Sequence, residues 1–156
     1  MVKKYILDVT PQTFIRTTAN DRIFFRIPRE KLHPPGLKRL LRIERYNNYK
    51  LDISAEAKRK HFTMPAAGAG FTFYIPLPKS WSKKKRKQYH GTFMQSTPDL
   101  DNYTKAVIDS LLSEDKYIAH YSYLCKRWVD FETGWIEIIV DDEVSMQCEI
   151  MPPAKG

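Results

Sequence analysis

Runs of β-branched and aromatic residues recur along the chain, separated by segments with helical spacing or turn residues. Such runs predict strands, because branched and aromatic side chains pack well on the pleated surface of a sheet. The clearest run, at positions 71–76, follows a segment of Ala and Gly. The predicted strands are Tyr5–Val9, Arg22–Ile27, Phe71–Pro76, Tyr121–Val129 and Gly134–Val140, and Asp130–Thr133 joins the last two as a hairpin.

Apolar residues at helical spacing predict one strong helix, over about Asn102–Leu112. Tyr103, Val107 and Leu111 recur every four residues, so they share one face of that helix. The opposite face is polar, which is typical of a helix packed on one side against a core.

Residues 34–61 are predicted to form two helical pieces separated by a loop. The Pro-Pro-Gly at 34–36 is typical of a turn, and Leu37–Tyr46 is basic and partly helical in pattern. The two asparagines at 47–48, between tyrosines, indicate a loop. Ser54 fits the N-cap of a short helix over Ala55–His61, with an acidic first turn and a basic last turn.

The order of these elements predicts an α+β fold in which one mixed sheet packs against two main helices. The chain has 156 residues, of which 42% are hydrophobic, so it can bury the core of one domain. We expect that domain to cover residues 1–151 and residues 152–156 to form a flexible tail. No segment has the apolar length of a membrane span, and the first residues do not resemble a signal peptide.

The two cysteines, Cys125 and Cys148, lie far apart in segments that we interpret as strands. They are expected to be free, buried thiols in a reducing compartment. Together with four scattered histidines they do not offer the spacing of a zinc site.

The chain carries 26 basic and 18 acidic residues, a formal net charge of +8. This excess favours a polyanionic partner, and nucleic acid is the best candidate because no amphipathic basic helix supports binding to a membrane surface. The most basic segment lies within Leu77–Gln95. We expect it to contact DNA phosphates, and the alternative is a solvated loop. Its basic residues are Lys79, Lys83, Lys84, Lys85, Arg86 and Lys87.

Two carboxylates follow Pro98 at a spacing of two, Asp99 and Asp101. If this segment is extended, both side chains point the same way, and their repulsion is relieved by a cation between them. Mg²⁺ is suitable because it prefers hard oxygen ligands. The alternative is a helix cap followed by a solvated turn, since an aspartate is also stabilised at a helix N-terminus.

The predicted helix extends this polar region. Asp101, Lys105 and Asp109 are four residues apart and therefore form a ridge along one face. A further acidic pair, Glu114-Asp115, follows the helix. The denser acidic run at 141–143 follows a strand and is interpreted as a solvated turn.

Taken together, Pro98–Leu112 and the following Glu114-Asp115 resemble the RusA family of Holliday-junction resolvases. The shared pattern is Asp-x-Asp-Asn, a lysine four residues on, an aspartate four further, and an acidic pair after the helix. The segments 78–86 and 53–57 are also similar to phage members of the family. The resemblance is strong over residues 76–139 and vague over 1–50.

The resemblance implies roles by position. Asp99, Asp101 and Asp115 match the acidic residues that bind the divalent metal, and Lys105 matches the catalytic lysine. Asp109 is expected to orient Lys105. The chain departs from the usual pair of aspartates after the helix, which leaves Glu114 and Asp115 both open as the third ligand. Asn102, Asp109 and Glu114 are expected beside the metal-binding set rather than in it.

The resemblance further implies a metal-dependent endodeoxyribonuclease that resolves Holliday junctions by paired phosphodiester hydrolysis in DNA recombination and repair. Its cofactor is expected to be Mg²⁺, with Mn²⁺ as an alternative and no other small-molecule cofactor. Its partners are expected to be four-way DNA and a second copy of the chain, in the cytoplasm of a bacterial cell and encoded by a phage or prophage. Two alternatives stay open: a nuclease for other branched DNA, and a non-catalytic nucleic-acid-binding protein.

Overall fold

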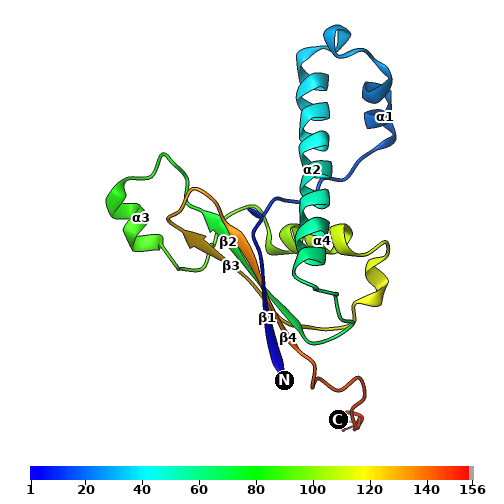
Figure 1. The fold of residues 1–156 in the computed structure, drawn as a ribbon, viewed down its shortest axis with the longest axis vertical. Coiled ribbons are helices and arrows are strands. Elements are labelled where there is room, and N and C mark those ends of the chain that lie inside the picture. Colours follow the sequence, from blue (N-terminus) through cyan, green and yellow to red (C-terminus); the bar gives the residue numbers. More distant parts are fainter. Residues whose placement is uncertain (155–156) are drawn as a thin grey trace.

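The computed structural model describes residues 1–154, which form a four-stranded sheet, four α-helices and two short 3₁₀ helices (Figure 1). The α+β fold with a mixed sheet, expected from the sequence, is confirmed. The elements in chain order are β1 (Val2–Leu7), α1 (Ala19–Arg26), η1 (Arg29–Lys31), α2 (Pro34–Arg59), β2 (Ala69–Pro76), α3 (Lys83–Tyr89), α4 (Leu100–Leu111), η2 (Asp115–Tyr117), β3 (Tyr121–Val129) and β4 (Trp135–Asp141).

The strands lie in the order β1-β4-β2-β3. β4 pairs antiparallel with both β1 and β2, whereas β2 and β3 are parallel. The hairpin predicted between β3 and β4 is therefore wrong, because β2 lies between them. β2 is almost entirely buried, and the central position gives its backbone a pairing partner on each edge.

Gly134 permits the connection from β3 to β4 to pass close to the end of β2. A Cβ at this position would lie 2.0 Å from the carbonyl oxygen of Tyr74, so no larger residue fits without moving the backbone. A short connection of this kind is easily mistaken for a hairpin turn when the sequence alone is considered.

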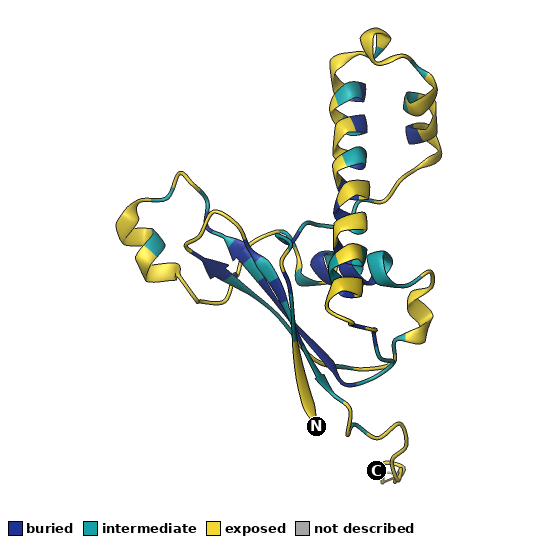
Figure 2. Cartoon of the chain, in the orientation of Figure 1, coloured by how far each residue is buried: buried dark blue, intermediate teal, exposed yellow. Residues whose placement is uncertain are grey.

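The core lies on one face of the sheet. Phe71 and Phe73 of β2 are directly opposite Ile138 and Ile136 of β4, and all four side chains are fully buried. Burial is concentrated along the sheet, on α4 and on one side of α2 (Figure 2). α4 confirms the strongest helix predicted from the sequence and begins two residues earlier than expected, at Leu100.

α2 is a single helix of 26 residues, about 39 Å long at a rise of about 1.5 Å per residue. The predicted turn at 34–36, loop at 46–49 and separate helix at 55–61 are therefore wrong. Two prolines start the helix because their fixed φ is favourable in its first turn. The tyrosines that flank the two asparagines are buried, and this burial outweighs the weak helix propensity of Asn.

The predicted strand at Arg22–Ile27 is also wrong, because most of this segment forms α1. Its β-branched and aromatic residues have no neighbouring strand with which to pair, and Ile23 and Phe25 are more than half exposed. The backbone N–H of Thr18 donates to Asp21 at 2.7 Å, which satisfies a polar group at the start of the helix.

α1, η1 and the first half of α2 form a helical arm that projects beyond the sheet (Figure 1). Arg39 of α2 holds the arm together by donating from Nε and Nη2 to the two carboxylate oxygens of Asp21, at 3.0 and 3.1 Å. A second ion pair joins Arg29 to Glu44. The arm therefore relies on charge-assisted hydrogen bonds as well as on buried apolar side chains.

Within residues 1–154, no helix is both long enough and apolar enough to cross a membrane. Both cysteines are free, as expected, but only Cys125 lies in a strand; Cys148 is exposed and outside the sheet, contrary to the prediction. Residues 152–154 have no helix or strand, and the remainder of the predicted tail, 155–156, lies outside the described residues.

Substitutions at Asn48 test the continuity of α2. Asn48 is exposed near the middle of the helix. Asn48→Ala should raise the free energy of unfolding by about 0.5 kcal/mol, because Ala has the higher helix propensity. Asn48→Pro should lower it by about 3 kcal/mol or more, because proline removes a helical hydrogen bond. Urea unfolding measures both, and two neutral substitutions would instead indicate a loop.

Candidate functional site

α4 presents the polar ridge that its sequence predicted. Tyr103 and Val107 are buried, and this fixes the rotation of the helix about its axis. Asp101 is consequently exposed, while Lys105 and Asp109 are partly exposed along the same side. The Lys105 Nζ lies 3.1 Å from Asp109 Oδ1, as expected for oppositely charged residues four positions apart.

The segment after α4 folds back and adds a carboxylate to this ridge. The Lys105 ammonium donates to Oδ2 of Asp115, the first residue of η2, and so lies between Asp109 and Asp115. Glu114 instead pairs with Lys116, at 2.7 Å. Of the two acidic residues that the sequence left open, Asp115 is therefore the one that contacts the ridge.

The two carboxylates stabilise the charged form of the lysine. The hydrogen bonds that Lys105 donates, to Asp115 first and then to Asp109, raise its pKa above the ordinary value, and Lys105 in turn lowers the pKa of Asp115. The lysine side chain is still 40% exposed. An ammonium group has three N–H donors, so Lys105 retains one for a ligand after bonding to both carboxylates.

A cavity of about 210 Å³ opens beside Lys105. Asp101 and Asp115 line it too, so three of the predicted site residues face one hollow. Tyr121 and Leu124, at the start of β3, complete its wall. These two residues were not predicted from the sequence, because no feature of their type distinguishes them from other strand residues.

Asp99 is the N-cap residue of α4, with an extended backbone (φ −66°, ψ 149°) and no side-chain hydrogen bond to the helix. Of the two alternatives for this segment, the extended run does not continue through Asp101, since the helix begins at Leu100. Strand geometry therefore does not make the two carboxylates converge. The carbonyl of Asn102 accepts a hydrogen bond from the backbone N–H of Phe14, at 3.1 Å, which anchors the first turn.

Lys126 of β3 positions the segment that precedes Asp99. Its Nζ donates to the carbonyl oxygens of Ser96 and Pro98, at 2.6 and 2.5 Å. This role of Lys126 was not predicted from the sequence either, because a lysine in a strand carries no signal of a partner 28 or 30 positions away.

The donor chemistry of the site fits a hard divalent cation, because all three predicted ligands are aspartates. Asp101 and Asp115 share the cavity, whereas Asp99 is not part of its lining. In the described part of the chain, no three His, Cys, Asp or Glu side chains are already grouped as a complete metal centre. The amino group of Lys105 contributes the positive charge between the carboxylates.

The basic segment forms α3, whose N-cap Ser82 accepts a hydrogen bond from the backbone of Lys85. Arg86 is committed to the fold, since it bonds to Asp130 and to the carbonyl of Pro78, both at 2.7 Å. The Lys85 Nζ lies 3.8 Å above the ring of Trp81. Four exposed lysines of the segment make neither a salt bridge nor a cation–π contact: Lys79, Lys83, Lys84 and Lys87.

α3 does not adjoin the ridge of α4. It lies beyond the ends of β2 and β3 in Figure 1, where Arg86 bonds to Asp130, whereas η2 shortly precedes the start of β3. The aromatic residues of the segment pack against one another and against the core, with Trp81 5.3 Å from Tyr89 and 5.4 Å from Trp128 between ring centroids. Any DNA bound by α3 must therefore extend across the molecule to reach Lys105.

A protein-family model described as endodeoxyribonuclease RusA matches residues 27–140 of this chain. The match covers α2, the whole sheet except β1 and the last residue of β4, the ridge of α4 and the basic α3. It excludes β1 and α1. A search of curated proteins found no match.

Removing the charge of Lys105 should remove the interaction that stabilises the ionised carboxyl group of Asp115. In Lys105→Gln the pKa of Asp115 should rise towards its ordinary value of 3.8, measured by NMR titration of the side-chain carboxyl carbons. Because the folded-state pKa of Asp115 is depressed, the pair stabilises the fold above pH 3.8, and this stabilisation is lost as the pH falls through the folded pKa.

Lys116→Gln is the matched control, since Lys116 is adjacent in sequence but pairs with Glu114. It should leave the titration of Asp115 unchanged. Equal effects of the two substitutions would contradict a specific pair between Lys105 and Asp115.

Proposed function

Because the chain belongs to the RusA family of Holliday-junction endodeoxyribonucleases, it is a hydrolytic nuclease, and we propose that the polar ridge of α4 is its phosphodiester-cleaving site. One observation supports this location above all. The amino group of Lys105 is held between Asp109 and Asp115 in a cavity that Asp101 also lines. The non-catalytic alternative gains no support from membership of a nuclease family.

Nucleases of this family are generally metal-dependent. We assign metal binding here to Asp99, Asp101 and Asp115, with Mg²⁺ as the preferred ion and Mn²⁺ as an alternative. The chemistry that such an ion supplies is polarisation of the phosphate and acidification of an attacking water.

Lys105 is assigned the stabilisation of the transition state. Its raised pKa keeps the amino group protonated at neutral pH, so a full positive charge faces the cavity. Its third N–H is directed at a phosphoryl oxygen, where negative charge increases as the bond to the leaving oxygen breaks. Asp109 holds the amino group from the helix side and so restricts its position. Lys126 holds the backbone before Asp99 and thereby positions that carboxylate.

The exposed lysines of the basic segment are proposed to bind the phosphates of a different part of the junction. α3 lies beyond the ends of β2 and β3 and away from the ridge, and a branched DNA substrate is large enough to contact both. Arg86, predicted from the sequence to bind DNA, is reassigned to fastening α3 onto Asp130. The positioning role of phosphate contacts does not require them to be adjacent to the cleaved bond.

A four-way junction has two-fold symmetry, and its resolution requires two matched incisions. We propose that a symmetric homodimer supplies the two sites. The same ridge can act on flaps or replication forks, which are the main alternative substrates. Digestion of these DNAs in parallel, with mapping of the cut positions, separates the cases: symmetric paired nicks in a mobile junction indicate resolution.

Asp99→Asn should lower the rate of junction cleavage in Mg²⁺ by about 100-fold or more, the scale expected when electrostatic stabilisation of a transition state is lost. Binding of the junction should be largely retained, because removal of a negative charge also reduces repulsion of the DNA. Denaturing electrophoresis of end-labelled strands measures the first effect, and a gel-shift assay measures the second.

Asp142→Asn is the matched control, since Asp142 lies in the acidic turn after β4 and far from the ridge in sequence. It should cleave at the wild-type rate. Full nicking activity in Asp99→Asn would overturn the proposed site.

Loss of three α3 lysines should weaken the salt dependence of DNA binding. If Lys83, Lys84 and Lys87 each contact a phosphate, the triple substitution to Gln should reduce the slope of log K against log salt by about 2.7, at about 0.9 per contact. The control is a triple substitution of exposed lysines outside the basic segment, Lys31, Lys58 and Lys60. Identical slopes for the two variants would show that α3 does not contact DNA.

A further inference from the structure

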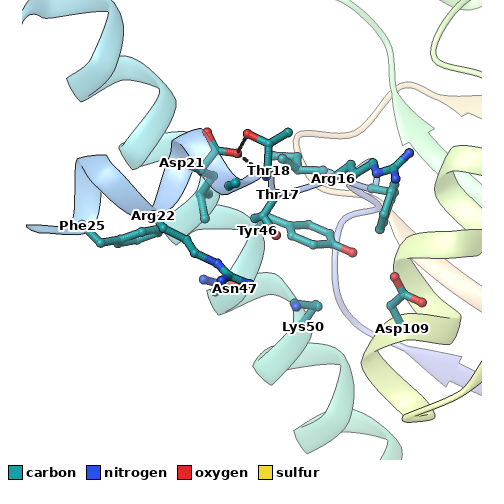
Figure 3. Close-up of a pocket in the computed structure, with 14 residues that line it drawn as sticks. Arg16, Thr17, Thr18, Asp21, Arg22, Phe25, Tyr46, Asn47, Lys50 and Asp109 are labelled. Carbon is teal, nitrogen blue, oxygen red and sulfur yellow. Dashed lines mark hydrogen bonds between the residues drawn. The ribbon is translucent and has the colours of Figure 1, made fainter.

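A groove of about 570 Å³ lies between the helical arm and α4. Its walls are the segment 14–18, α1, the middle of α2 and, at one end, Asp109 of α4 (Figure 3). We call it the arm groove. Because Asp109 also contacts Lys105, the arm groove meets the ridge of α4 at this residue.

The walls of the arm groove are fixed by a clamp on its outer side. Besides its two bonds to Asp21, Arg39 donates to the carbonyl of Arg16, at 2.8 Å. Asp21 is buried, and Arg39 holds the pKa of its carboxyl well below the usual range. The clamp thus ties the segment that enters α1 to α2 and neutralises the carboxylate on this side of the groove.

The remaining charge in the lining is positive. Arg16, Arg22 and Lys50 line the groove, and none of them has a carboxylate within 4.0 Å anywhere in residues 1–154. Each of the two carboxylates of the lining has a cationic partner: Asp21 pairs with Arg39, and Asp109 pairs with Lys105, which also bonds to Asp115. Three uncompensated cations facing one hollow favour an anionic ligand.

A buried hydroxyl group points into the same space. Tyr46 is only 3% exposed, and its hydroxyl has no hydrogen-bond partner within the described chain. In Figure 3 the ring extends from α2 across the groove, with the hydroxyl towards Asp109. Burial raises the pKa of Tyr46 to about 12, so the group is a hydrogen-bond donor at neutral pH. Buried donors without an acceptor are rare, and a ligand oxygen would satisfy this one.

We infer that the arm groove binds the phosphodiester backbone of a DNA strand that continues to the ridge of α4. The inference rests on the proposed function, in which the substrate is branched DNA. Arg16, Arg22 and Lys50 supply the charge for phosphate oxygens, and the Tyr46 hydroxyl donates to one of them. The half-exposed ring of Phe25, at the mouth of the groove, provides an apolar surface for a sugar or base.

The arm groove is only partly built from the matched family region. Arg16, Arg22 and Phe25 precede residue 27, where the family match begins, whereas Tyr46 and Lys50 lie within the match. The groove thereby assigns a role to the N-terminal part of the chain, for which the sequence offered none.

A charge-matched pair of double variants tests the inference. Arg22→Gln/Lys50→Gln removes two cations from the groove, whereas Arg26→Gln/Lys58→Gln removes two from the same helices outside it. In junction binding without divalent metal, the groove variant should raise Kd about tenfold over the control. Its slope of log K against log salt should be smaller by about 1.8, for two lost phosphate contacts.

The Tyr46 hydroxyl is tested by Tyr46→Phe, which removes one oxygen atom. Junction affinity should fall about threefold, while the urea midpoint should not fall, because the lost hydroxyl has no partner in the protein. Tyr49→Phe is the control, since Tyr49 is also a buried tyrosine of α2 but does not line the groove. It should leave the affinity unchanged. A lower midpoint with unchanged affinity in Tyr46→Phe would indicate a structural role and overturn the inference.

The outcomes separate the inference from the function on which it rests. If the wild-type protein cuts the junction and the two double variants bind it equally, the arm groove does not hold DNA and the inference is wrong. If the wild-type protein neither binds nor cuts branched DNA, the proposed function is wrong and the inference fails with it.

Discussion

Tyr103, Ala106 and Val107 of α4 are buried in the core, and this burial fixes the direction of every polar side chain on the helix. At 3.6 residues per turn, a helix with this face inward presents positions 101, 105 and 109 along one outer line. The geometry of the proposed phosphodiester-cleaving site is thus set by apolar packing. A rotation of α4 would move Lys105 away from Asp115 and out of the cavity.

The charges of the molecule are arranged so that anions can approach from more than one side. Lys105 offsets part of the negative charge of the ridge, and Arg39 pairs with Asp21 at the arm groove, so repulsion of a phosphate is reduced at both places. Cations without a carboxylate partner lie on α3 and in the arm groove, among other positions. A branched DNA has backbone in several directions, and a basic protein of this shape can contact more than one arm.

Local patterns predicted the elements in which the neighbouring residues themselves determine the conformation. The strands β2, β3 and β4 and the helix α4 fall within two residues of their expected bounds, because periodicity and propensity agree there. α1 and α2 were misread for the opposite reason. The two asparagines of α2 and the aromatic residues of α1 have unfavourable local propensities, and only burial of the tyrosines against the core and the clamp by Arg39 make these segments helical. The prediction of a β3–β4 hairpin was wrong because strand pairing depends on residues that are distant in the sequence: β2 pairs with both strands and lies between them.

The sequence alone determined the spacing of Asp101, Lys105 and Asp109, since helical geometry converts a repeat of four into one ridge. It also determined the basic character of α3 and the family. The tertiary structure decided which acidic residue joins Lys105, how Lys126 holds the turn before Asp99, and that Arg16 and Lys50 face one groove. The physical reason is the separation in sequence over which the interactions act. A helix forms through hydrogen bonds between residues four apart, whereas these contacts join distant segments that only burial of the core brings together.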